Sequence, residues 1–172
     1  MRKQLVLSMA LALVCCSCAK KNKWVTFSPE GGQFEIELPF EPKGTEINFN
    51  LPDGSVMSGW NYIAENPKGM SFTVGYNDWP ESWTSSRPVD WFLDSGRDGM
   101  IKTLGGTMTR ETRIELNGNH GRDVIGSIPG LGLIMGRVYM VGNRYYQISV
   151  FYEPDTVDYA KTQKFFDSFN VK

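Results

Sequence analysis

The stretch Leu131–Tyr152, LGLIMGRVYMVGNRYYQISVFY, constrains the fold of this chain more than any other segment. Two runs rich in β-branched and aromatic residues meet there at Gly142-Asn143. Both residues tolerate a positive φ, so the pair predicts a hairpin with a two-residue loop. In that register Val141 faces Arg144, and apolar side chains fall on both faces of the ribbon. We therefore expect a central antiparallel ribbon that is at least partly covered on each side.

Strand signals before and after a central helix predict how this ribbon is extended into a sheet. Residues 33–38 alternate apolar and polar side chains, which is typical of a strand with one solvated face. Residues 56–64 and 70–76 flank a Pro/Gly turn, and we expect them to pair as a hairpin. The remaining strands are expected at residues 24–27, 45–51, 107–116 and 122–128, with a turn over residues 117–121.

Apolar stripes at helical spacing predict two helices that pack on the sheet. The first begins at Pro88, a favourable first-turn residue, and runs to Leu104. Gly96 and Gly99 lie inside it at a cost of about 1 kcal/mol each relative to alanine, and we attribute both to close packing of helix on sheet. The second helix is expected over residues 155–169, with the stripe Thr162, Phe165, Phe166 and Phe169.

The order of these elements defines the expected fold class. Residues 77–87 hold turn formers and two tryptophans without a period, so they are expected to form a long loop. Strands, a helix, more strands and a closing helix predict an α+β fold, in which an antiparallel sheet of about seven to nine strands packs with two helices. We place this fold in a single domain over residues 24–172.

The first residues have the features of a bacterial lipoprotein signal, which we assign to residues 1–17. A basic start precedes an apolar run that is shorter than the roughly 20 residues of a membrane-spanning helix. Cys18 follows this run directly after a small residue and is the preferred lipidation site, with Cys16 as the alternative. An ordinary cleaved signal peptide is the competing interpretation. On the lipoprotein interpretation, residues 18–23 form a basic tether to a membrane of the cell envelope, facing the periplasm or the exterior.

Composition narrows the chemistry that the folded part can perform. All three cysteines lie in the proposed signal and anchor, so the domain has no thiol for a disulfide, a nucleophile or a metal site. Removal of two basic residues with the signal, from 18 basic against 19 acidic residues, leaves a net charge of −3. A mildly acidic domain is a poor candidate for nucleic-acid binding. The expected partners are therefore the membrane, through the lipid, and an envelope protein.

Several motifs that suggest chemistry have a simpler explanation. His120 is the only histidine, and because one histidine cannot form a transition-metal site alone, we interpret it as a solvated turn residue. Gly130, Gly132 and Gly136 are spaced like a dinucleotide loop, but they open a strand where that motif requires a helix. No nucleophile elbow of the GxSxG type is present.

Charged side chains suggest two further sites, each with an ordinary alternative. Asp94, Arg97 and Asp98 lie close together on the expected central helix and could form a polar site, although such spacing is more typical of solvated ion pairs. Asp53 and the acidic residues of the 77–87 loop could offer oxygens to calcium, but they lack the spacing of a calcium-binding loop. We therefore expect no metal and no cofactor.

The tryptophan loop is the strongest candidate for a binding site. It combines Tyr76, Asp78, Trp79, Glu81 and Trp83. A tryptophan has a large apolar area and an N–H group that needs a partner, which suits a recognition surface or a clamp onto the protein's own core. The sequence leaves both interpretations open.

Two segments resemble a known family. VGNRYYQISV at residues 141–150 and KFFDSF at residues 164–169, in this order of elements, resemble PsbP-like domains and in particular bacterial envelope lipoproteins that carry this fold. The resemblance implies an antiparallel sheet with packed helices and brings no catalytic motif. We therefore expect a lipid-anchored, non-enzymatic binding or interaction module. The alternative is a hydrolase or other enzyme whose site is dispersed among the loops.

Overall fold

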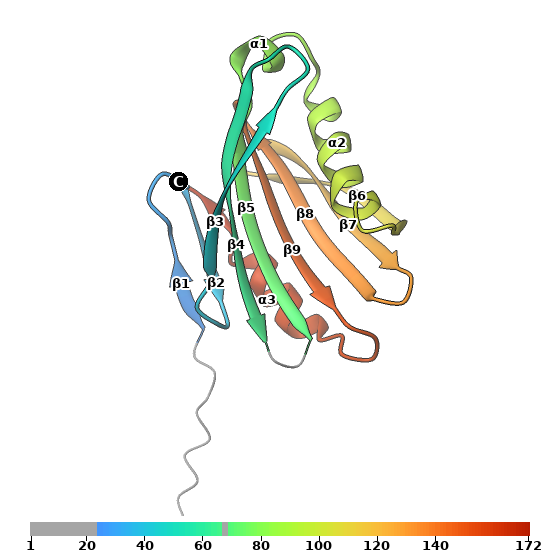
Figure 1. Ribbon diagram of the computed structural model, residues 1–172. Helices are drawn as coiled ribbons and strands as arrows, with labels where there is room; N and C mark the ends of the chain where they lie inside the picture. Colours follow the sequence, from blue (N-terminus) through green and yellow to red (C-terminus); the bar gives the residue numbers. More distant parts are fainter. Residues whose placement is uncertain (1–23, 67–68) are drawn as a thin grey trace, which may run out of the picture.

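The computed structural model describes residues 24–66 and 69–172, which form two antiparallel sheets with helices packed on them (Figure 1). The large sheet has the order β3 (Lys43–Asn50), β4 (Val56–Asn66), β5 (Met70–Asp78), β9 (Arg144–Tyr152), β8 (Gly132–Val141), β7 (Asn119–Ile128) and β6 (Thr107–Leu116). The small sheet consists of β1 (Val25–Phe27), β2 (Phe34–Leu38) and β10 (Asn170–Val171). The helices are α1 (Glu81–Thr84), α2 (Val89–Lys102) and α3 (Tyr159–Asp167).

The predicted central hairpin is confirmed residue by residue. Val141 pairs with Arg144 and Tyr139 with Tyr146, and Gly142 has a φ of 60° in the two-residue loop. Strand β9 also pairs with β5, so the hairpin lies in the interior of the large sheet. The predicted β1–β2 and β4–β5 hairpins are present as well.

Both faces of the large sheet are covered, as the hairpin pattern predicted. On one face, Tyr139 and Tyr146 belong to a core that α3 and the small sheet complete with Phe34 and Phe165. On the other face, the alternate residues Ile134, Val138 and Met140 of β8 pack with Phe92, Leu93, Met100 and Ile101 of α2. Figure 1 shows α2 and α3 on these two sides of the sheet. The α+β fold class is therefore confirmed, with ten strands and three helices in the described part of the chain.

The structure corrects the predicted loop over residues 77–87. Strand β5 continues to Asp78, where Asp78 pairs with Arg144 of β9, and the single helical turn α1 follows. The strand boundary was misplaced because Asn77 and Asp78 are turn formers by residue type, whereas here they pair with Tyr145 and Arg144 of β9.

Two other boundaries also differ from the prediction. The predicted turn over residues 117–121 is only the pair Asn117-Gly118, both with positive φ, and β7 already begins at Asn119. Helix α3 begins at Tyr159, four residues later than predicted, and the carboxylate of its N-cap residue Asp158 accepts a hydrogen bond from the Lys161 amide at 3.0 Å. The strand β10 was not predicted; it pairs with β2 directly after the closing helix.

Candidate functional site

A cavity of about 570 Å³ lies between α2 and the part of the large sheet formed by β3, β4, β5 and β9. The helix packs on β7 and β8, and the same face of the sheet continues beyond it toward the edge strand β3 (Figure 1). We call this cavity the groove. Its lining residues are Ile47, Phe49, Met57, Asn61, Gly75, Tyr76, Asn77, Trp79, Phe92, Ser95, Gly96, Gly99, Met100, Thr103, Tyr145 and Gln147. Among these described residues none carries a charge.

The floor of the groove follows from the strand register. Asn61 of β4, Gly75 of β5 and Gln147 of β9 lie side by side across the sheet. Asn77 lies two residues further along β5 on the same face. Three side-chain amides therefore lie around Gly75, but Asn77 is buried and its Nδ2 donates to Met57 Sδ at 2.9 Å. A Cβ at Gly75 would lie 3.0 Å from Asn61 Oδ1, so the missing side chain leaves room for this amide beside the strand.

The helix wall of the groove depends on two glycines of α2. A Cβ at Gly96 would overlap the ring and hydroxyl of Tyr145, so the predicted close packing of helix on sheet is confirmed at this position. A Cβ at Gly99 would meet no atom within 4 Å in the described part of the chain, so the same explanation is wrong there: Gly99 faces open space in the groove. Burial raises the pKa of Tyr145, which keeps its phenol neutral.

The predicted tryptophan loop is divided by the structure. Tyr76 and Trp79 are among the lining residues, but the Tyr76 ring packs with Phe34 and Tyr146 in the core on the opposite face. Asp78, Glu81 and Trp83 are not among the lining residues. Trp79 is half-buried, its amide donates to the Asn143 carbonyl at 2.9 Å, and its indole Nε1 is buried without a partner in the described residues. Trp83 and Asp78 instead contact Asp53 and Arg144, in other parts of the fold.

Trp83 acts as a clamp on the protein's own fold. It is 8% exposed, and its Nε1 donates to Asp53 Oδ2 at 2.6 Å. Hydrogen bonds from Ser55 and then from Trp83 lower the pKa of Asp53 to about 2. The Arg87 guanidinium lies 3.8 Å from the centre of the Trp83 ring. These contacts tie α1 to the β3–β4 connection.

Asp78 is engaged by Arg144 in a two-point ion pair. Arg144 Nε and Nη2 lie 2.6 Å from the two Asp78 carboxylate oxygens, and Nη1 donates to the carbonyls of Gly31 and Gly32 at 2.6 and 3.1 Å. The hydrogen bond to Asp78 raises the pKa of Arg144. This contact joins the β1–β2 turn to the end of the central hairpin. In the described residues no group of three or more acidic or histidine side chains is placed to hold a metal.

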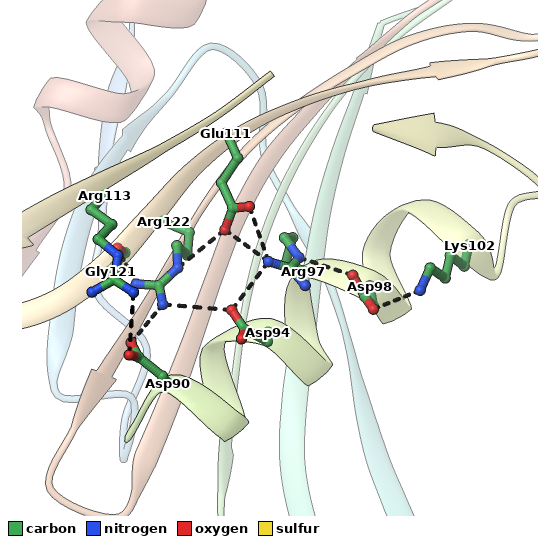
Figure 2. A network of polar contacts seen from close by, with 9 residues as sticks. All are labelled: Asp90, Asp94, Arg97, Asp98, Lys102, Glu111, Arg113, Gly121 and Arg122. Carbon is green, nitrogen blue, oxygen red and sulfur yellow. Dashed lines mark hydrogen bonds and ion pairs between the residues drawn. The ribbon is translucent and has the colours of Figure 1, made fainter. Parts of the chain in front are cut away.

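The charged side chains of α2 belong to a larger cluster, shown in Figure 2. Arg97 contacts Asp94 at 3.1 Å, Asp98 at 2.9 Å and Glu111 of β6 at 2.9 Å. Arg122 of β7 is buried, and its Nε lies 3.1 Å from Glu111. Glu111 and Arg122 give no sequence signal for this cluster, because they are far from α2 in the chain.

This cluster fixes α2 on β6 and β7. Arg122 also contacts Asp90 at 2.5 Å, and that hydrogen bond lowers the pKa of Asp90 (Figure 2). Four acidic residues face four basic ones, so the cluster is balanced in charge; its members are Asp90, Asp94, Asp98 and Glu111 with Arg97, Lys102, Arg113 and Arg122. By holding α2, the cluster sets the position of the groove wall.

The remaining predicted residues lie outside the groove. His120 is exposed as predicted, but it belongs to β7, where it pairs with Glu115, and not to a turn. Cys16, Cys18, the signal over residues 1–17 and the tether over residues 18–23 lie outside the described residues. No helix in the described ranges is both long and apolar enough to span a membrane.

Comparison with known proteins identifies the class of fold. No protein-family model matches the chain, and no curated protein sequence matches it significantly. The antiparallel sheet with helices on its faces is a PsbP-like α+β fold, which confirms the fold part of the resemblance. The solution structure of cyanobacterial PsbP (CyanoP) from Synechocystis sp. PCC 6803 superimposes with a TM-score of 0.59 and 12% identity, over 93% of this chain and 99% of that one. A crystal structure of protein PA94 from Pseudomonas aeruginosa gives a TM-score of 0.43 and 10% identity, over 81% and 90% of the two chains.

Proposed function

We propose that this protein is a non-enzymatic binding module held at a membrane of the cell envelope by a lipid anchor, and that the groove holds its ligand. The observation that carries the proposal is the groove itself, whose described lining combines aromatic rings and side-chain amides without a charge. Ligand sites in proteins typically have apolar walls and a few polar groups that set orientation. The PsbP-like fold is compatible with such a module.

The described lining favours binding over turnover. General acid–base catalysis needs a group that titrates near the working pH, usually a histidine, a carboxylate or a lysine. The described lining offers Ser95, Thr103 and Tyr145 as hydroxyl groups but no such base, and burial holds the Tyr145 phenol neutral. A hydrolase would have to recruit its base from outside the groove.

The anchor is proposed from Cys18, with Cys16 as the alternative. The six residues 18–23 would reach about 20 Å when extended, so the domain would stay close to the membrane surface. Palmitate labelling of the full chain tests this part of the proposal. We expect Cys18→Ala to abolish labelling and Cys16→Ala to leave it; labelling that survives both single substitutions and the double one would contradict the anchor.

Blocking the groove tests the binding proposal. Gly99→Phe would place a ring in open space on the groove wall, and the change also improves helix propensity. In a thermal-shift screen of neutral compounds, ligands at about 100 times their Kd should stabilise the native protein by about 2.7 kcal/mol. We expect these shifts to disappear in Gly99→Phe.

A matched variant on the same helix controls for the added apolar surface. Val89→Phe places the ring at a position outside the groove, where the native residue is 40% exposed. It should keep the ligand-induced shifts. Equal shifts in Gly99→Phe and the native protein, or a screen without any shift, would refute the groove as the binding site.

A further inference from the structure

We infer that the ligand of the groove is a neutral sugar, an inference that rests on the proposed binding function. The ligand would lie over Gly75, with its hydroxyl groups on the Asn61 and Gln147 amides of the floor and an apolar ring face against the aromatic side chains. The register of the sheet, the exposure of Phe49 and the uncharged described lining each support one part of this assignment.

The spacing of the amides suits a ring that bears several hydroxyl groups. Asn61 and Gln147 lie in one row on strands β4 and β9, two strand spacings apart, or about 10 Å between backbones. Asn77 lies on β5 between them and one row further along, but it is buried and its Nδ2 donates to Met57 Sδ at 2.9 Å. Each of the other two amides offers donors and an acceptor, and a hydroxyl group can do both. The Asn61 and Gln147 side chains can therefore each reach a different hydroxyl of one ring that lies over Gly75.

Aromatic side chains supply the apolar contacts. Phe49 on the edge strand β3 is 49% exposed and lines the groove, which makes it an uncovered flat surface at the outer side. Phe92 of α2 and Trp79 line the groove at its inner part. A sugar ring has an apolar C–H face and a polar edge, and an aromatic ring contacts such a face with large apolar area. The groove offers both kinds of surface within one cavity.

Other ligand classes fit the groove less well. A charged ligand would lose hydration without an opposite charge in the described lining, and burial of an unpaired charge is costly. An alkyl chain would cover Asn61 and Gln147 without offering hydrogen bonds to their amides, at a cost of about 1–3 kcal/mol for each buried group left unpaired. An extended peptide would pair with the free edge of β3, beside the groove and not on its floor.

The test uses the full chain in phospholipid nanodiscs, because many detergents contain a sugar. Isothermal titration would compare glucose, galactose, mannose, N-acetylglucosamine, maltose and cellobiose with the charged analogues glucuronate and glucosamine, with octanol, and with end-blocked tetra-alanine. We expect at least one neutral sugar to bind and the charged analogues to bind at least tenfold more weakly.

Substitutions in the floor should weaken sugar binding without unfolding the protein. Asn61→Ala and Gln147→Ala should each reduce the affinity about tenfold, which corresponds to about 1.4 kcal/mol. Asn48→Ala is the matched control, because Asn48 is an exposed amide on β3 outside the groove. It should leave the affinity unchanged, and melting temperatures would show that each variant is folded.

The outcomes separate this inference from the proposed function. One outcome is that no neutral sugar binds, whereas octanol or tetra-alanine binds and Gly99→Phe blocks this binding. That outcome would overturn the sugar assignment and leave the groove as a binding site. Sugar binding that is unchanged by Asn61→Ala and Gln147→Ala would also overturn it. Absence of binding by every probe would overturn the sugar assignment, and a blank thermal-shift screen would then refute the binding function as well.

Discussion

A single methyl group added to α2 should have opposite effects at two positions three residues apart. Gly96 lies against Tyr145, and a Cβ there would overlap three atoms of that side chain, its Oη, Cζ and Cε2. Gly99 faces the groove, and a Cβ there would have no neighbour within 4 Å in the described residues. Gly96→Ala and Gly99→Ala are thus the same chemical change on one helix, with different surroundings.

The expected magnitudes follow from two opposing effects. Replacement of glycine by alanine in a helix interior stabilises it by about 1 kcal/mol. Overpacking of a core costs about 1–3 kcal/mol, and we expect the upper end for Gly96 because the buried Tyr145 ring must move. The free energy of unfolding should therefore fall by about 2 kcal/mol in Gly96→Ala and rise by about 1 kcal/mol in Gly99→Ala.

Thermal and urea unfolding would measure both effects. For a domain of this size, the melting temperature should decrease by about 4–8 °C in Gly96→Ala and increase by about 2–4 °C in Gly99→Ala. Tyr145→Phe removes one of the overlapping atoms and should restore part of the stability of Gly96→Ala. Equal changes in the two alanine variants would refute the packing of α2 on Tyr145 as described.

Two further predictions concern ion pairs and pH. Arg144→Lys keeps the charge but loses the two-point contact with Asp78 and the hydrogen bonds to the glycine carbonyls. The free energy of unfolding, measured in urea, should therefore fall by about 2 kcal/mol. Arg110→Lys, at an exposed position, is the control and should change it by less than about 0.5 kcal/mol. Asp53 has its pKa lowered from 3.8 to about 2, so its stabilising effect is complete above pH 3.8 and is lost as the pH falls toward 2. Asp53→Asn should therefore lose less stability than the native protein between these pH values, and parallel pH profiles would contradict the hydrogen bonds of Asp53 with Ser55 and Trp83.

The sequence predicts the strands best where turn chemistry is local. Gly142-Asn143 defines the register of the whole central hairpin, and every predicted pair is present. Asn117-Gly118 carries the same information, but the nearby Gly121 makes the predicted turn, residues 117–121, longer than the observed one. In the structure a Cβ at Gly121 would lie 2.6 Å from the Tyr139 ring on the neighbouring strand. A glycine required by a distant aromatic ring cannot be distinguished locally from a turn glycine.

The groove could not be predicted because no local pattern encodes it. Its floor joins Asn61 and Gly75 with Gln147, which is far along the chain and adjacent only through the β5–β9 pairing. Gly75 sits inside a strand and gives no signal that it lies between these two amides. Trp79 was found by its residue type alone, whereas the role of Trp83 depended on its contact with Asp53.

The pairing of β10 with β2 has a consequence for the order in which the chain can fold. Phe34 of β2 contacts Phe169 at 5.7 Å between ring centres, and the Lys172 amide donates to the Gln33 carbonyl at 3.0 Å. Strand β2 therefore obtains neighbours from residues that lie more than 130 positions later in the chain. A nascent chain cannot complete this part of the core until α3 and β10 have been synthesised. That delay would keep the polypeptide open for passage across a membrane, as the proposed lipoprotein signal requires.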